Sequence, residues 1–195
     1  MYFLTGGRGT DSRLYRLSYE GSESTKAISP KDFTLPKMHQ IRRQLEAYHG
    51  IADPKAVAAA WPHLSSSDRW LRHAARVAIE SQPVDQWAKK VFESNNTQAT
   101  ITGAVALARM GTQAYQEQII ASLLKIDFDS LKTQEKLGLL RAYALTFIRL
   151  GEPKAKDRES VIAQLDPKIP AEEDDLNTEL LRVLVYLKAP GIITK

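Results

Sequence analysis

The sequence has no cysteine among its 195 residues. Disulfides, thiolate metal sites, cysteine nucleophiles and covalent haem attachment are therefore excluded within this chain. It also has no apolar run near the roughly 18 residues that a bilayer-spanning helix needs. The first residues, Met1–Leu4, run directly into Thr5-Gly6-Gly7, without the basic and then apolar pattern of a signal peptide. Neither a membrane span nor a signal peptide is expected in this chain.

A strong charge of one sign is also missing. The chain has 27 Lys and Arg against 23 Asp and Glu, which leaves a net charge of +4. Such a small excess does not by itself indicate a nucleic acid or a membrane surface as partner. The composition, 43% hydrophobic and 26% charged, is ordinary for a globular domain with a core of its own.

Catalytic motifs are scarce as well. The chain has no Gly-x-Ser-x-Gly elbow, no kinase motif set and no dinucleotide fingerprint. Its four histidines, His39, His49, His63 and His73, lack the i, i+4 spacing of a helical zinc site, so hydrogen-bonded or exposed roles are favoured. The turn Gly6–Gly9 lacks the Gly-Lys-Ser/Thr ending of a phosphate loop. We therefore predict a chain that is not an enzyme and has no cofactor and no metal site.

The first 21 residues differ from the rest of the chain. Tyr2–Thr5 and Leu14–Tyr19 have the composition and alternation of strands, and a Gly-rich turn separates them. Residues 1–21 are thus predicted to form a β-hairpin. Residues 22–36 are polar, contain Pro30 and Pro36, and show no helical period, which indicates a linker.

Helical patterns dominate from residue 37 onward, and Asp68–Glu80 is the clearest. Asp68 follows three serines at a position where its side chain can cap a helix. The apolar residues then recur at helical spacing: Leu71, Ala74, Ala75, Ala78 and Ile79. A short helix before this stretch completes a helix pair with a polar turn and an Asp-led second helix, which is the HEAT-repeat pattern.

Further pairs follow at intervals of roughly 30 to 40 residues, as in α-solenoids. The pairs are expected at 53–64 with 68–81, 83–92 with 97–110, 115–126 with 131–150, and 156–165 with 176–187, after a first helix at 38–48. The sequence therefore predicts an all-α, right-handed α-α superhelix, a HEAT-like solenoid of about four helix pairs, over residues 37–195. The acidic run Glu172–Asp175 is expected to favour a helix N-terminus, in preference to a metal site.

The second helix of each pair is expected to lie on the concave side. That face would carry Arg69, Trp70, Arg72, Arg76, Arg109, Arg141, Arg149 and Arg182. Two interpretations stay open: either Asp68 and Arg72 form a ladder between repeats with the other arginines scattered on the surface, or the arginines line a groove for an acidic protein segment or a polyanion. The tryptophans Trp61 and Trp87 are expected in packing between repeats, and Trp70 can belong to the binding surface.

Several segments carry a resemblance to a known family, and they extend over nearly the whole chain. They are Tyr2–Gly9, Leu14–Tyr19, Ile41–Glu46, Trp61-Pro62, Asp68–Glu80, Leu139–Tyr143 and Leu184–Gly191. They resemble large secreted bacterial proteins that join a sugar-dehydrogenase-like β-propeller to HEAT repeats and often to a cytochrome c module. The hairpin is similar to the end of the propeller. This chain lacks the propeller body and the Cys-x-x-Cys-His haem site, so no active-site residue or haem ligand carries over.

The resemblance implies a fragment of a larger exported protein, periplasmic or extracellular, with other domains of the same polypeptide or another protein as partners. Its expected function is that of a non-enzymatic scaffold or protein-interaction module between a dehydrogenase-like propeller and an electron-transfer module. The alternative is a HEAT-like nucleic-acid-binding protein or alkyl-base DNA glycosylase with a basic concave groove. Asp68, Trp70 and the groove arginines would then supply its acid, its aromatic residue and its positive charge.

Overall fold

The computed structural model describes residues 1–27 and 36–192. The chain divides into two compact units, Met1–Leu35 and Pro36–Lys195, which are treated separately below. Positions 28–35 of the expected linker, with Pro30, and the last three residues of the expected helical domain lie outside the described residues. No helix of the described residues is long and apolar enough to cross a membrane.

The first unit contains an antiparallel hairpin of β1 (Tyr2–Gly7) and β2 (Thr10–Arg16). Leu4 pairs with Leu14, and the Phe3 and Tyr15 rings stack at 5.1 Å. The second strand begins earlier than the expected Leu14 because Arg8 and Gly9 alone form the turn, with Gly9 at φ 85°. The strand ends at Arg16, opposite Tyr2, and the Leu17 N–H beyond it donates to the Met1 carbonyl at 2.8 Å.

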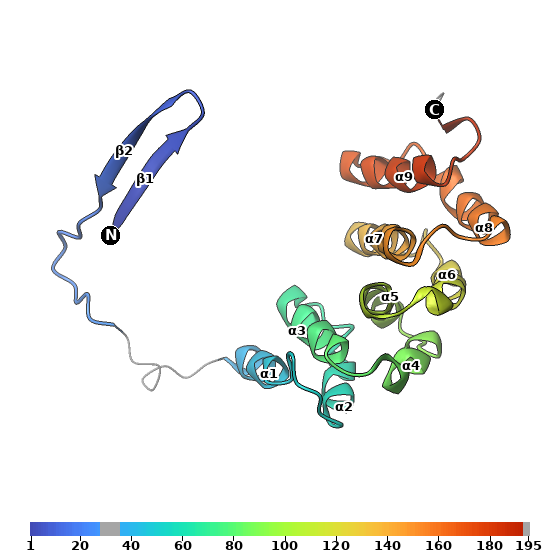
Figure 1. Ribbon diagram of the computed structural model, residues 1–195, viewed down its shortest axis with the longest axis horizontal. Helices are drawn as coiled ribbons and strands as arrows, with labels where there is room; N and C mark the ends of the chain where they lie inside the picture. The colour runs from blue at the N-terminus through green and yellow to red at the C-terminus, as the bar shows by residue number, and fades with distance from the viewer. Residues whose placement is uncertain (28–35, 193–195) are drawn as a thin grey trace. The chain divides into compact units, whose positions relative to one another are not determined.

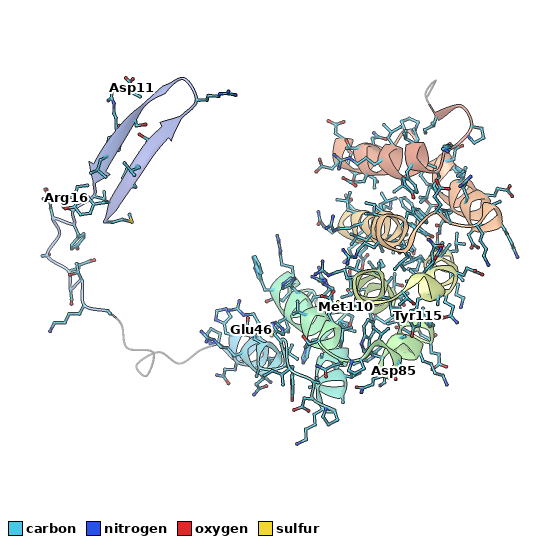
Figure 2. The ribbon with its side chains drawn as sticks, in the orientation of Figure 1. Asp11, Arg16, Glu46, Asp85, Met110 and Tyr115 are labelled. Atoms are coloured by element: carbon cyan, nitrogen blue, oxygen red, sulfur yellow. The ribbon has the colours of Figure 1, made fainter. Side chains whose placement is uncertain are left out.

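The second unit is helical, with short 3₁₀ segments at several turns (Figure 1). Its α-helices are α1 (Lys37–Glu46), α2 (Ala56–Ala60), α3 (Arg69–Glu80), α4 (Ala88–Phe92), α5 (Thr97–Met110), α6 (Gln116–Leu124), α7 (Thr133–Leu150), α8 (Ala155–Leu165) and α9 (Asp174–Tyr186). Figure 2 marks Met110 at the end of α5 and Tyr115 just before α6. The Tyr115 ring packs on Phe92 of α4, with 6.3 Å between ring centroids.

The helices of this unit form two rows. One row consists of α3, α5, α7 and α9, each in contact with the next, and the other contains α4, α6 and α8 (Figure 1). Helices that follow one another in the chain also contact each other: α2 contacts α3, and α6 of one row contacts α7 of the other. Large side chains are buried in this packing, among them the fully buried Trp87, Tyr143 and Phe147. This packing leaves the outer side of the α3, α5, α7 and α9 row free to present side chains.

The helix α3 follows the sequence pattern closely. The Asp68 Oδ1 accepts hydrogen bonds from the backbone N–H of Trp70 at 2.8 Å and of Leu71 at 3.1 Å. The expected apolar face is buried: Leu71, Ala74, Ala75, Ala78 and Ile79 are each at most 2% exposed. Asp68 thus begins the helix that supplies one side of the groove described below.

The first helices of two pairs are shorter than expected. Instead of one helix over 53–64, α2 ends at Ala60 and a 3₁₀ turn, Trp61–His63, follows. Pro62 lacks the N–H that would continue the α-helical ladder. Instead of starting a helix, Pro83 precedes a 3₁₀ turn, Val84–Gln86. Trp87, at φ −135°, separates that turn from α4, and its buried indole donates to the Gln82 carbonyl at 3.3 Å.

Candidate functional site

A groove of about 240 Å³ lies along α3, α5 and α7. We call it the arginine groove, and it is lined by Arg69, Arg72, His73, Arg76, Gln98, Ile101, Thr102, Val105, Gln134, Gly138 and Arg141. Four of the expected arginines therefore come together, three from α3 and one from α7. The lining contains no carboxylate. A groove of this composition attracts anions, because guanidinium groups bind carboxylates and phosphates through paired hydrogen bonds.

The arginines of the groove differ in how firmly they are held. The Arg72 Nη1 donates to the Ser66 carbonyl, and the Arg76 Nη1 pairs with the Glu80 carboxylate. The Arg69 guanidinium lies over the Trp70 ring, 4.7 Å from its centroid. Arg69 and Arg141 make no hydrogen bond or ion pair within the described part of the chain. These two side chains are the ones most available to a ligand.

Glu80 connects neighbouring helices of the row. Its carboxylate, 7% exposed, accepts from Arg76 one turn earlier and from the Arg109 Nε at 3.0 Å on α5. The Arg149 Nη2 of α7 in turn donates to the Arg109 backbone carbonyl at 3.3 Å. Arg109 and Arg149 therefore tie helices together and do not line the groove. Sequence analysis missed Glu80, although its i, i+4 spacing from Arg76 was a usable signal.

The expected ladder of Asp68 and Arg72 is not what joins the helices here. The Asp68 carboxylate caps α3, and Arg72 donates to the Ser66 carbonyl, so both contacts stay within one helix and the turn before it. Among the described residues, the ionic contact that joins α3 to α5 is the one between Glu80 and Arg109. The backbone N–H groups of Leu71 and Trp70 hold the pKa of Asp68 below its ordinary value.

A second hollow adjoins the arginine groove and shares Arg141 with it. This α7–α9 groove, of about 400 Å³, is lined by Leu137, Arg141, Ala144, Asp175, Thr178, Glu179 and Arg182. The Arg182 Nη1 pairs with the Glu179 carboxylate, so their charges offset each other. Arg182 is thus placed apart from the arginines of α3, in surroundings of mixed charge.

His73 is the titratable group of the arginine groove. Its Nδ1 lies 3.2 Å from the Arg76 Nη2, a contact in which the arginine donates and the imidazole accepts. Partial burial and the positive charge of Arg76 lower the pKa of His73. The neutral imidazole is therefore the form that fits the contact with Arg76.

The remaining expected site residues are dispersed. Trp70 is 59% exposed beside the groove, whereas Trp87 is fully buried and Trp61 is half-buried. His49 lies 2.9 Å from the Ala74 carbonyl oxygen through its Nε2. Over the described ranges, no three His, Asp or Glu side chains gather as metal ligands would. The arginine groove is the feature of this unit with a clear binding chemistry.

Comparison with protein-family models, with curated proteins and with solved structures finds no match to this chain.

Proposed function

We propose that the helical unit is a right-handed, HEAT-like solenoid that acts as a non-enzymatic protein-interaction module. Two rows of helices, with each helix packed on the next of its row, support this architecture. Stacked helix pairs expose one continuous row of second helices, which in such folds is an extended binding surface. In this chain that row carries the arginine groove.

The ligand that we propose is an acidic segment of a protein partner. The observation that carries the proposal is the lining of the arginine groove: four arginines and no carboxylate. Arg72 is held in place by the Ser66 carbonyl, so its positive charge is preorganised, whereas Arg76 shares its charge with the Glu80 carboxylate. Arg69 and Arg141 complete the set, and their guanidinium groups make no hydrogen bond or ion pair within residues 1–27 and 36–192. Carboxylate side chains of an extended segment match this arrangement.

We also propose that this module serves within a larger exported protein, where it links a dehydrogenase-like propeller to an electron-transfer module. The support is the resemblance of the hairpin and of Asp68–Glu80 to such proteins. A periplasmic or extracellular location goes with this proposal. The acidic segment would then belong to another domain of the same polypeptide or to a separate protein.

Nucleic acid is the second candidate ligand, because Trp70 is exposed and stacked under Arg69. Aromatic and arginine side chains of this kind stack on unpaired bases. For base excision, however, an acid would have to face the groove. Asp68 does not line it and uses its carboxylate as a helix cap. We therefore favour the protein partner.

The test is binding of a fluorescein-labelled poly-glutamate peptide by fluorescence anisotropy. We expect the double variant Arg69→Glu/Arg141→Glu to bind about tenfold more weakly or worse, since attraction becomes repulsion at two positions. The matched control is Lys125→Glu/Lys156→Glu, which makes the same charge change at exposed lysines on or beside α6 and α8. Equal loss in both variants would overturn the proposal. Tighter, salt-dependent binding of duplex DNA would favour the second candidate.

A further inference from the structure

We propose that the partner segment of the arginine groove carries apolar anchor residues next to its acidic block, and that the anchors bind on α9. This inference rests on the proposed function and specifies the partner further. It starts from an apolar surface of α9 that continues the two grooves described above. The surface, which we call the α9 patch, is formed by Thr178, Leu181, Arg182, Val185 and Tyr186.

The α9 patch is exposed although it is largely apolar. Val185 is 55% exposed, Tyr186 42% and Leu181 37%. Their spacing places them on one face of α9, while Leu180, Val183 and Leu184 of the same helix are buried in the core. The Tyr186 ring stacks on the buried Phe147, with 5.7 Å between ring centroids, so one of its faces belongs to the core packing, while Leu181 and Val185 stay exposed. Exposed apolar side chains that gather on one helix face are typical of a binding surface.

The patch is continuous with the arginine groove through shared residues. Arg141 lines both the arginine groove and the α7–α9 groove. Thr178 and Arg182 line both the α7–α9 groove and the α9 patch. A single extended segment can thus pass from the arginines on α3 to the apolar side chains on α9.

Charge changes along this path. The arginine groove has four guanidinium groups and no carboxylate in its lining. At the α9 end, Glu179 pairs with Arg182, so this arginine brings little unpaired charge to the patch. An acidic block therefore fits the first part of the path and uncharged apolar residues fit the last. Charge would set the direction and position of the segment, and apolar burial would add affinity.

The experiment compares two labelled peptides: a glutamate block alone, and the same block followed by a short spacer and a Leu-Phe anchor. Binding is measured by fluorescence anisotropy on the full chain. We expect the anchor to tighten binding about fivefold to tenfold, because part of two apolar side chains leaves water. Val185→Asp should remove this gain and leave the affinity for the glutamate block unchanged. Val185 is half-exposed, so the variant is expected to fold.

The matched control is Ile148→Asp, since Ile148 is 72% exposed on α7 and lines none of the three surfaces. This variant should keep the full gain from the anchor. If both peptides bind equally well to the unaltered chain, the inference is wrong and the proposed function still stands. If neither binds, the proposed function itself fails. Sedimentation that shows a dimer lost in Val185→Asp would identify a second copy as the occupant and overturn the inference.

Discussion

Glu80 makes opposing contributions to stability and to binding. Its buried carboxylate accepts from Arg76 and Arg109, which joins α3 to α5. The same contact with Arg76 neutralises part of the positive charge of the arginine groove. The Arg76 guanidinium therefore contributes both to the stability of the fold and to the affinity for an anion. A substitution of Glu80 should change these two properties in opposite directions.

Replacing Glu80 by Gln should lower the free energy of unfolding by about 1–2 kcal/mol, since two charge-assisted hydrogen bonds are weakened. It should also tighten binding of the glutamate peptide, because Arg76 then keeps its full charge for the ligand. Urea unfolding and anisotropy measure the two effects. Glu93→Gln is the control, as its carboxylate is exposed and pairs with Lys89 at 3.6 Å. A loss of affinity in Glu80→Gln would contradict this account of the groove.

The imidazole of His73 links stability to pH. Partial burial and Arg76 lower its pKa in the folded chain, so the unfolded chain binds this proton more readily. The free energy of unfolding should therefore fall as the pH drops through about 6.5, the ordinary histidine value. His73→Gln should show a smaller loss of stability between pH 8 and pH 5 in urea unfolding. An identical pH dependence in both proteins would exclude this role of His73.

At the scale of the helices, Gly103 permits the close approach of α4 and α5. A Cβ at this position would lie 2.7 Å from Val91 Cγ2 and 2.9 Å from Cγ1, which is too close for either branch. Gly103→Ala should thus destabilise the fold by about 1–3 kcal/mol despite its better helix propensity. Thermal unfolding of Gly103→Ala, Val91→Ala and the double variant would test this contact, because the double variant should lose less than the two single losses combined.

Gly138 on α7 offers the matched comparison for this substitution. A Cβ there would meet Ile101 Cγ2 at 3.4 Å, an ordinary contact. Gly138→Ala should therefore stabilise the helix by up to about 1 kcal/mol through its propensity. Destabilisation by both substitutions alike would show that the close packing of Val91 is not what decides the result.

The extent to which sequence predicts these helices depends on local signals. Thr97–Met110 is α5 with the predicted ends, because the Asn96 side chain accepts from the Ala99 N–H at 2.9 Å and Gly111 follows the last turn. The helix expected over 83–92 was predicted with the correct end but too early a start: α4 begins at Ala88, because Trp87, at φ −135°, interrupts the helical backbone after the turn Val84–Gln86. The contact of Glu80 with Arg109 depends on the register between two helices, which no periodicity within either helix specifies.

The same distinction applies to the arginines. Their place on the second helices followed from helical period and spacing. The sequence did not predict which of the arginines line the groove. Arg109 and Arg149 make contacts between helices, whereas Arg69 and Arg141 make no such contact within the described residues. Arginines on the same face thus have two roles: some join helices and others can bind a ligand. Only the contacts in the folded structure show which arginine has which role.

At the scale of the whole chain, the hydrophobic core belongs to the helical unit. The core residues of the described chain run from Leu45 to Ile192, and none comes from the hairpin. A fragment of residues 36–195 should therefore keep its helical circular dichroism and melt within a few degrees of the full chain. A peptide of residues 1–35 should be largely unfolded, because two strands alone bury too little apolar surface. A fragment that melts far below the full chain would contradict this division, because residues 1–35 would then contribute to the stability of the helical unit.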